Sequence, residues 1–155
     1  MTIDRYARPE VERRFLLDAV PAHATDPVEI SDRYIDGGHL RLRKVESQNA
    51  PTTYKLGHKH RPDPADPGVV FHTTIYLTEA EHTLFARLPA RELRKTRYRV
   101  DVAGRPAVID ELHGPHAGPV LLEVGFTPEE DRLAFVAPPW VGAETTLSGG
   151  ELASI

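Results

Sequence analysis

The sequence predicts a single α+β domain built mainly from an antiparallel sheet that curls or closes on itself. Short stretches with alternating polar and apolar residues recur along the chain, and glycine- and proline-rich turns join them. Only one segment has a clear helical pattern. Many short strands with local connections and few helices are typical of curled or closed antiparallel sheets. A length of 155 residues suits one domain over residues 1–155.

Five strands are expected in the first half of the chain. The clearest alternation lies in residues 39–45, directly after a Gly-Gly turn. The proline-rich segment 61–68 is expected to form a stiff exposed loop rather than a domain linker, because regular structure resumes directly after it. The five predicted strands cover residues 10–17, 28–35, 39–45, 53–58 and 69–77.

One helix is expected after these strands. Thr78 and Glu81 have the spacing of a capping box, in which each side chain satisfies a free backbone N–H group of the other residue. The helix should end before Pro89, and its apolar stripe consists of Leu84, Phe85 and Leu88. Three more strands are predicted over residues 94–102, 107–112 and 120–126, followed by a short helix within residues 127–137.

Composition excludes several classes of protein. The chain has no cysteine, which removes disulfides, thiolate metal sites and cysteine nucleophiles. No apolar run approaches the roughly 20 residues that span a bilayer. Residues 1–8 lack the apolar core of a signal peptide, so a cytoplasmic location without membrane attachment is expected. Nucleic-acid binding is disfavoured because the net charge is −4 and the bases are spread over many strands.

Basic residues recur at strand spacing. Side chains at positions i and i+2 of a strand project from the same face, so each set forms a row. A solvated outer face is the ordinary interpretation of such charges. However, rows of like charge on neighbouring strands repel one another, unless a polyanion lies between them. Polyphosphate should therefore stabilise a protein whose empty site is strained by repulsion. The rows are Arg41 with Arg43, Lys55 with Lys59, and Lys95 with Arg97 and Arg99.

A few carboxylates accompany these bases, namely Glu10, Glu12, Asp110 and Glu123. Carboxylates close to a polyphosphate would repel it unless they hold a divalent metal ion that also contacts the phosphates. Arginine and lysine neutralise phosphoryl oxygens. Carboxylates and bases together thus predict a site for phosphoryl chemistry with a metal ion.

On these residues the chain resembles the CYTH domain family, also called triphosphate tunnel metalloenzymes. The family signature Glu-x-Glu-x-Lys is matched by residues 10–14, with Arg14 in place of lysine. The similarity then runs in the expected order through nearly the whole chain. It continues through Leu40-Arg-Leu-Arg43, Tyr54-Lys-Leu56, Lys95-Thr-Arg-Tyr98, Asp110, Leu122-Glu-Val124, Pro138-Pro-Trp140 and Ser148-Gly-Gly150.

The resemblance implies an eight-stranded antiparallel β-barrel that forms a tunnel, with a few helices packed outside. It further implies hydrolysis of inorganic, nucleoside or thiamine triphosphate with Mg²⁺ or Mn²⁺, or cyclisation of ATP. The partner would be a small triphosphate or nucleotide. By the same resemblance, the metal ligands are Glu10, Glu12 and Glu123. The catalytic residues are Glu10, Glu12, Arg14 and Asp110. The phosphate-binding residues are Arg41, Arg43, Lys55 or Lys59, Lys95 and Arg97.

Three positions depart from the family pattern. Gly125 stands where relatives place a second carboxylate on the late strand, and Arg14 replaces a lysine that could release a proton. His72 and Thr74 stand where many relatives have acids. These departures keep open an alternative, a tunnel that binds a phosphorylated ligand with weakened or altered catalysis. Histidine pairs at 58 and 60 and at 113 and 116 are interpreted as exposed rather than metal-binding. The sequence gives no oligomeric state.

Overall fold

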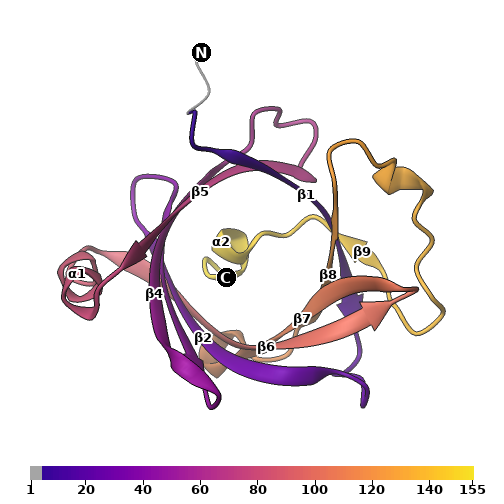
Figure 1. Ribbon diagram of the computed structural model, residues 1–155, viewed down its shortest axis with the longest axis horizontal. Coiled ribbons are helices and arrows are strands. Elements are labelled where there is room, and N and C mark those ends of the chain that lie inside the picture. The colour runs from indigo at the N-terminus through magenta and orange to yellow at the C-terminus, as the bar shows by residue number, and fades with distance from the viewer. Residues whose placement is uncertain (1–4) are drawn as a thin grey trace.

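Eight strands close into a ring in the computed structural model, which describes residues 5–155 (Figure 1). Residues 1–4, which are half of the segment where no signal peptide is expected, lie outside the described residues. The elements are β1 Arg8–Leu17, β2 Thr25–Ile35, β3 Leu40–Ser47, β4 Ala50–His60, β5 Val69–Leu77, α1 Glu79–Phe85, β6 Ala90–Val102, β7 Arg105–His113, η1 Gly114–His116, β8 Val120–Phe126, η2 Arg132–Ala134, β9 Glu144–Thr145 and α2 Gly149–Leu152.

The ring follows the order β1-β5-β4-β3-β2-β6-β7-β8 and returns to β1, with antiparallel pairing throughout. Strand β1 closes it, because the residues from Arg8 to Val11 pair with β5 while those from Val11 to Leu17 pair with β8. Beyond Val11 the edge of β1 that faces β5 is taken by the two-residue strand β9. The predicted eight-stranded antiparallel barrel is confirmed.

The outer face of the barrel carries the largest hydrophobic core. Apolar residues at alternate positions of β1, β6, β7 and β8, such as Phe15, Ile109 and Leu122, are buried there. The segment after β8 covers them with Phe135 and Val141. This segment takes only three residues of 3₁₀ helix, Arg132–Ala134, so the helix expected within residues 127–137 is not formed. It runs in extended form because its apolar side chains pack on the curved sheet.

Helix α1 lies outside the ring (Figure 1) and begins after Thr78 as predicted, but it ends at Phe85, and Leu84 and Leu88 of the predicted apolar stripe are exposed. The Thr78 side chain accepts a hydrogen bond from the Glu81 backbone, and the Glu81 side chain accepts one from Thr78, which completes the capping box. Phe85 packs against Leu42 and Leu56 on the outer face of the sheet. Neither α1 nor any other helix among residues 5–155 is long and apolar enough to span a membrane.

Helix α2 lies within the ring when the barrel is viewed along its axis (Figure 1), so the expectation that helices pack only outside is wrong for this element. Its Leu152 is buried against Leu93, Leu112 and Leu121 of the surrounding strands. These leucines face inward at one end of the barrel, where an apolar side chain needs cover. The C-terminal segment supplies that cover.

Candidate active site

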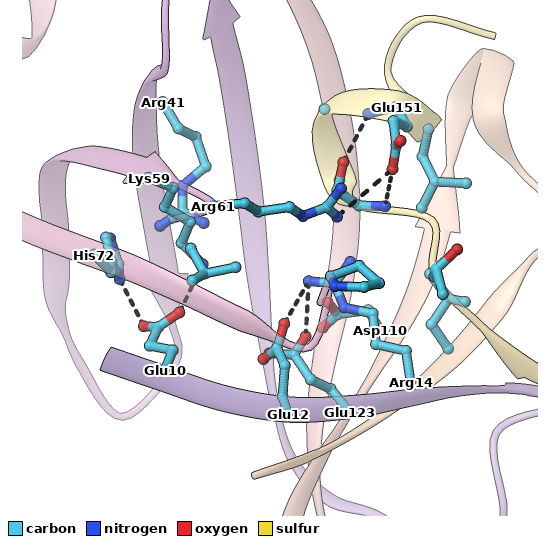
Figure 2. A pocket seen from close by; sticks show the side chains of 18 of the residues that line it. Glu10, Glu12, Arg14, Arg41, Lys59, Arg61, His72, Asp110, Glu123 and Glu151 are labelled. Atoms are coloured by element: carbon cyan, nitrogen blue, oxygen red, sulfur yellow. Dashed lines mark hydrogen bonds and ion pairs between the residues drawn. The ribbon is translucent and has the colours of Figure 1, made fainter. Parts of the chain in front are cut away.

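The interior of the barrel is a cavity of about 830 Å³, which is within the size range of small-molecule binding sites. Among the described residues, ten lysines and arginines and seven carboxylates line it, an excess of positive charge. The alternation of side chains along six strands, β1, β3, β4, β6, β7 and β8, brings most of the predicted side chains inward, and Figure 2 shows several of them. Those that line the cavity are Glu10, Glu12, Arg14, Arg41, Arg43, Lys59, Lys95, Arg97, Asp110 and Glu123.

Lys55 does not line the cavity. Its ammonium group lies 5.2 Å from the centre of the Tyr76 ring, a cation–π contact with a largely exposed tyrosine. Lys59, four residues further along β4 and on the same face, lines the cavity instead. The hairpin register pairs Lys55 with Arg43, so the two side chains start from the same face of the sheet, but the Lys55 ammonium group turns to Tyr76 on the neighbouring strand.

Three of the predicted phosphate-binding bases are held by two buried aspartates. Arg97 donates two hydrogen bonds to Asp110, at 2.7 and 2.8 Å, and Lys95 Nζ lies 2.8 Å from the same carboxylate. Burial alone would raise the pKa of Asp110, but these cations lower it to about 2. Burial lowers the pKa of Lys95 to about 8 against the opposing effect of Asp110.

Asp32 pairs with Arg43 as Asp110 pairs with Arg97. The two side chains form a bidentate pair at 2.7 and 2.8 Å, and the Asp32 side chain has no exposed surface. Burial opposes ionisation of this carboxyl, but the charge of Arg43 lowers its pKa well below the usual value. The expected repulsion among unpaired bases is therefore wrong for Arg43, Lys95 and Arg97, since each has a buried partner.

Glu12 and Glu123 bring two carboxylates to neighbouring strands. Arg14 Nη2 lies 3.1 Å from Glu12 Oε1 and 3.5 Å from Glu123 Oε2, so one guanidinium serves both (Figure 2). Burial, followed by the proximity of Glu123, raises the pKa of Glu12 to about 8, while the pKa of Glu123 is lowered. The pair thus holds one proton at neutral pH, as two close carboxylates do.

Glu10 has different partners from Glu12. Its Oε2 accepts a hydrogen bond from Lys59 Nζ at 3.0 Å, and its Oε1 lies 2.6 Å from His72 Nδ1. Burial would raise the pKa of Glu10, but these two neighbours lower it to about 2. Glu10 is therefore an ionised carboxylate whose two oxygens are both engaged.

Arg41 is the least satisfied base in the cavity. Its Nε is buried without a hydrogen-bond partner among the described residues, and it lies 4.0 Å from Asp32 Oδ1. Burial and the charge of nearby Arg43 lower the pKa of Arg41. A buried guanidinium with free donors is costly without a ligand, and it points to an anion that enters the cavity.

The C-terminal segment supplies part of the cavity wall. Arg14 donates to the backbone carbonyl of Leu147 at 2.8 Å, and Arg91 donates to that of Gly150 at 3.1 Å. Glu151 of α2 lies 4.0 Å from Arg61 (Figure 2). Several cationic side chains are thereby oriented by residues that showed no periodic pattern in the sequence.

Several residues in or beside the cavity were not assigned from the sequence, among them Asp32, Arg61 and Glu151. Asp32 lies between Ser31 and Arg33, so no alternation of polar and apolar residues marks its face. Arg61 begins the proline-rich loop, and Glu151 lies in the unassigned tail. The capping-box spacing of Ser148 and Glu151 is the one signal that could have revealed α2, and the structure contains that capping box.

The arrangement of carboxylates bears on metal binding. Within residues 5–155 no group of three or more histidine or carboxylate side chains is placed to hold a metal ion. The expected set of Glu10, Glu12 and Glu123 is thus not gathered around one point. Glu12 and Glu123 alone fit Mg²⁺ or Mn²⁺, because such ions commonly take one or two carboxylates and complete their shell with water and phosphate oxygens.

Comparisons with known proteins support the same fold. No family model matches the chain. It is 28% identical over 142 residues to an inorganic triphosphatase of Nitrosomonas europaea, a match that covers 88% of this chain and 89% of the relative. The crystal structure of the inorganic triphosphatase NE1496 superposes with a TM-score of 0.62 and 24% identity, over 92% of this chain and 96% of that one. A second structure of NE1496, described as a hypothetical protein, gives the same TM-score and identity. The chain therefore has the barrel fold of these solved structures.

Proposed function

We propose that this chain hydrolyses a phosphoanhydride bond of a triphosphate, with inorganic tripolyphosphate as the first substrate to consider. The observation that carries the proposal is the buried guanidinium of Arg41, whose Nε has no hydrogen-bond partner among the described residues, inside a closed barrel with an excess of cationic side chains. A relative named inorganic triphosphatase matches the chain over most of its length, which supports the same reaction.

The chain's own residues divide the work of binding. Asp32 and Asp110 fix the guanidinium and ammonium groups behind the cavity, so these cations need little reorganisation when the anion enters. Arg41 and Lys59 line the cavity and would bind the phosphoryl oxygens, Lys59 while its Nζ also donates to Glu10. The closed wall of the barrel limits water around the substrate and strengthens each of these interactions.

Glu12 and Glu123 would hold one divalent cation, either Mg²⁺ or Mn²⁺. When bound, such an ion neutralises phosphate oxygens and lowers the pKa of a bound water. Glu12 would hold the ion as a carboxylate, and Arg14 is hydrogen-bonded to the backbone carbonyl of Leu147 beside it. Hydrolysis adds one water, breaks one P–O bond and yields orthophosphate and diphosphate.

Phosphate release from tripolyphosphate, with and without Mg²⁺ or Mn²⁺, tests the proposal. The wild-type protein should release phosphate only with a cation, and Glu123→Gln should release little or none. Glu129→Gln serves as a matched control, because Glu129 is exposed outside the cavity. Absence of release by a folded wild-type protein, with either cation and with ATP or thiamine triphosphate as well, would contradict the proposal.

A second candidate is a tunnel that binds triphosphate without turnover. The position of Arg14 favours it, because the guanidinium already neutralises the Glu12 and Glu123 carboxylates. Gly125 favours it also, since the carboxylate expected there is absent. Tight binding by calorimetry without phosphate release, together with gain of release in Gly125→Glu, would select this candidate.

A further inference from the structure

His72 is held inside the cavity by two polar contacts. Its Nδ1 lies 2.6 Å from Glu10 Oε1, and its Nε2 lies 3.1 Å from the hydroxyl of Thr74. The His72 side chain is 12% exposed and lines the cavity. A carboxylate beside Nδ1 favours the proton on that nitrogen, so Nε2 is the acceptor nitrogen of the ring, and the Thr74 hydroxyl lies beside it.

The fold leaves space for this imidazole at one glycine. A Cβ atom on Gly57 would lie 2.8 Å from His72 Nε2 and 3.6 Å from Arg41 Nη2. Any side chain at position 57 would therefore displace the ring. His72 Nε2 and the Arg41 guanidinium thus both lie over the bare backbone of Gly57, and Lys59 reaches the same place from the next inward position of β4 (Figure 2).

These groups form a subsite at a definite distance from the carboxylate pair. Glu10 and Glu12 are two residues apart on β1, which corresponds to roughly 7 Å along an extended strand. A triphosphate is long enough to reach from one position to the other. The groups near Glu12 and Glu123 and the groups near Glu10 can thus contact opposite ends of one substrate molecule.

We propose that His72, together with Arg41 and Lys59, binds the phosphoryl end of the substrate that lies away from Glu12 and Glu123. Glu10 acts here as a positioning residue that orients His72 and Lys59. Nε2 would accept a hydrogen bond from a phosphoryl hydroxyl in place of the one from the Thr74 hydroxyl. The inference rests on the proposed triphosphate site, and it assigns that site a substrate contact from a histidine.

Two substitutions separate a ligand contact from a structural role. The amide nitrogen of asparagine takes the place of Nδ1, so His72→Asn keeps the bond to Glu10 and loses the ligand-side group. The longer glutamine reaches the place of Nε2, so His72→Gln keeps the ligand-side group and loses the bond to Glu10. His58→Asn is the matched control, because His58 is exposed and does not line the cavity.

Binding of tripolyphosphate is measured by calorimetry in EDTA, where no cation-dependent turnover occurs. We expect the Kd to rise roughly 10-fold or more in His72→Asn, the loss of one hydrogen bond to a charged group. It should rise less in His72→Gln and stay unchanged in His58→Asn. Circular dichroism melting of each variant verifies that it is folded.

The outcomes distinguish the inference from the proposed function. Two results would overturn the role of His72, even if the wild type hydrolyses tripolyphosphate. One is a His72→Asn variant with the same Kd as the wild type, and the other is a Kd that rises more in His72→Gln than in His72→Asn. The expected order of Kd values in a protein without phosphate release would support the subsite and contradict hydrolysis. Failure of the wild type to bind tripolyphosphate would contradict both.

Nitrogen-15 NMR of the histidine rings gives a readout that does not depend on affinity. Addition of tripolyphosphate should shift the Nε2 resonance of His72 in the wild type. In Glu10→Gln the His72 ring should lose its single Nδ1–H tautomer, which tests the positioning role of Glu10. An Nε2 resonance that does not respond to tripolyphosphate, or a fixed Nδ1–H tautomer in Glu10→Gln, would contradict the proposed contacts.

Discussion

Asp32→Asn is expected to destabilise the fold strongly, because it leaves a buried cation without its counter-charge. The Asp32 side chain is 0% exposed and that of Arg43 is 8% exposed. Lys95 Nζ and Arg41 Nε lie 3.8 and 4.0 Å from the same carboxylate, so more than one cation loses its partner. Removal of one member of a buried ion pair costs about 3–5 kcal/mol, and we expect about 4 kcal/mol for Asp32→Asn.

Urea unfolding at neutral pH measures this loss. Glu92→Gln is the control, because Glu92 pairs with Arg33 but its side chain is 66% exposed, and such a pair contributes about 0–1 kcal/mol. In a domain of this size, a loss of 4 kcal/mol lowers Tm by roughly 8–16 °C. Tripolyphosphate should restore more stability to Asp32→Asn than to the wild type, since the anion replaces the missing charge. A loss below about 1 kcal/mol, equal to the control, would refute this reasoning.

Three further predictions concern the cavity. The pKa of Glu12 is raised to about 8 by burial and Glu123, so the native state keeps a proton that the unfolded chain has lost, and stability falls as pH rises through 8. Calorimetric Tm without cation should thus fall from about pH 6 to about pH 9, and the same slope in Glu12→Gln would contradict this. Arg41→Met should raise the KM for tripolyphosphate roughly 10- to 100-fold in steady-state assays, with little loss of stability against urea. An unchanged KM would count against the Arg41 guanidinium as a phosphate ligand. A Cβ atom on Gly125 meets nothing within 4 Å, so Gly125→Glu should fold normally and lower the Mn²⁺ concentration for half-maximal phosphate release; no change would show that the added carboxylate does not reach the cation.

Much of the barrel could be predicted because its two faces differ in polarity. In β6, Lys95 and Arg97 alternate with Val100 and Val102 further along, and the structure places the bases in the cavity and the valines in the outer core. The alternation of side chains between the two faces of a strand was enough to predict which bases share a face. Helix α1 was predictable since its capping box is a local signal.

The rest depended on long-range pairing that no local pattern reveals. The expected metal set counted Glu10, but the closure of β1 onto β5 brings His72 to that carboxylate and occupies it. Neither sequence neighbour of Asp32 is apolar, so alternation does not indicate which face of β2 its side chain lies on, although it forms the bidentate pair with Arg43. Helix α2 lies inside the ring because Leu152 is buried among leucines of β6, β7 and β8. The C-terminal sequence has no periodic pattern that would indicate this position.

The most direct test is a crystal structure of the protein with tripolyphosphate, grown with Ca²⁺ or without a divalent cation to limit turnover. It should show the three phosphorus atoms inside the barrel, with oxygens against Arg41 and Lys59 and one end near Glu12 and Glu123. An anion bound only on the outer surface, or a cavity that stays filled with water at saturating tripolyphosphate, would contradict the central claim that this barrel is a triphosphate site.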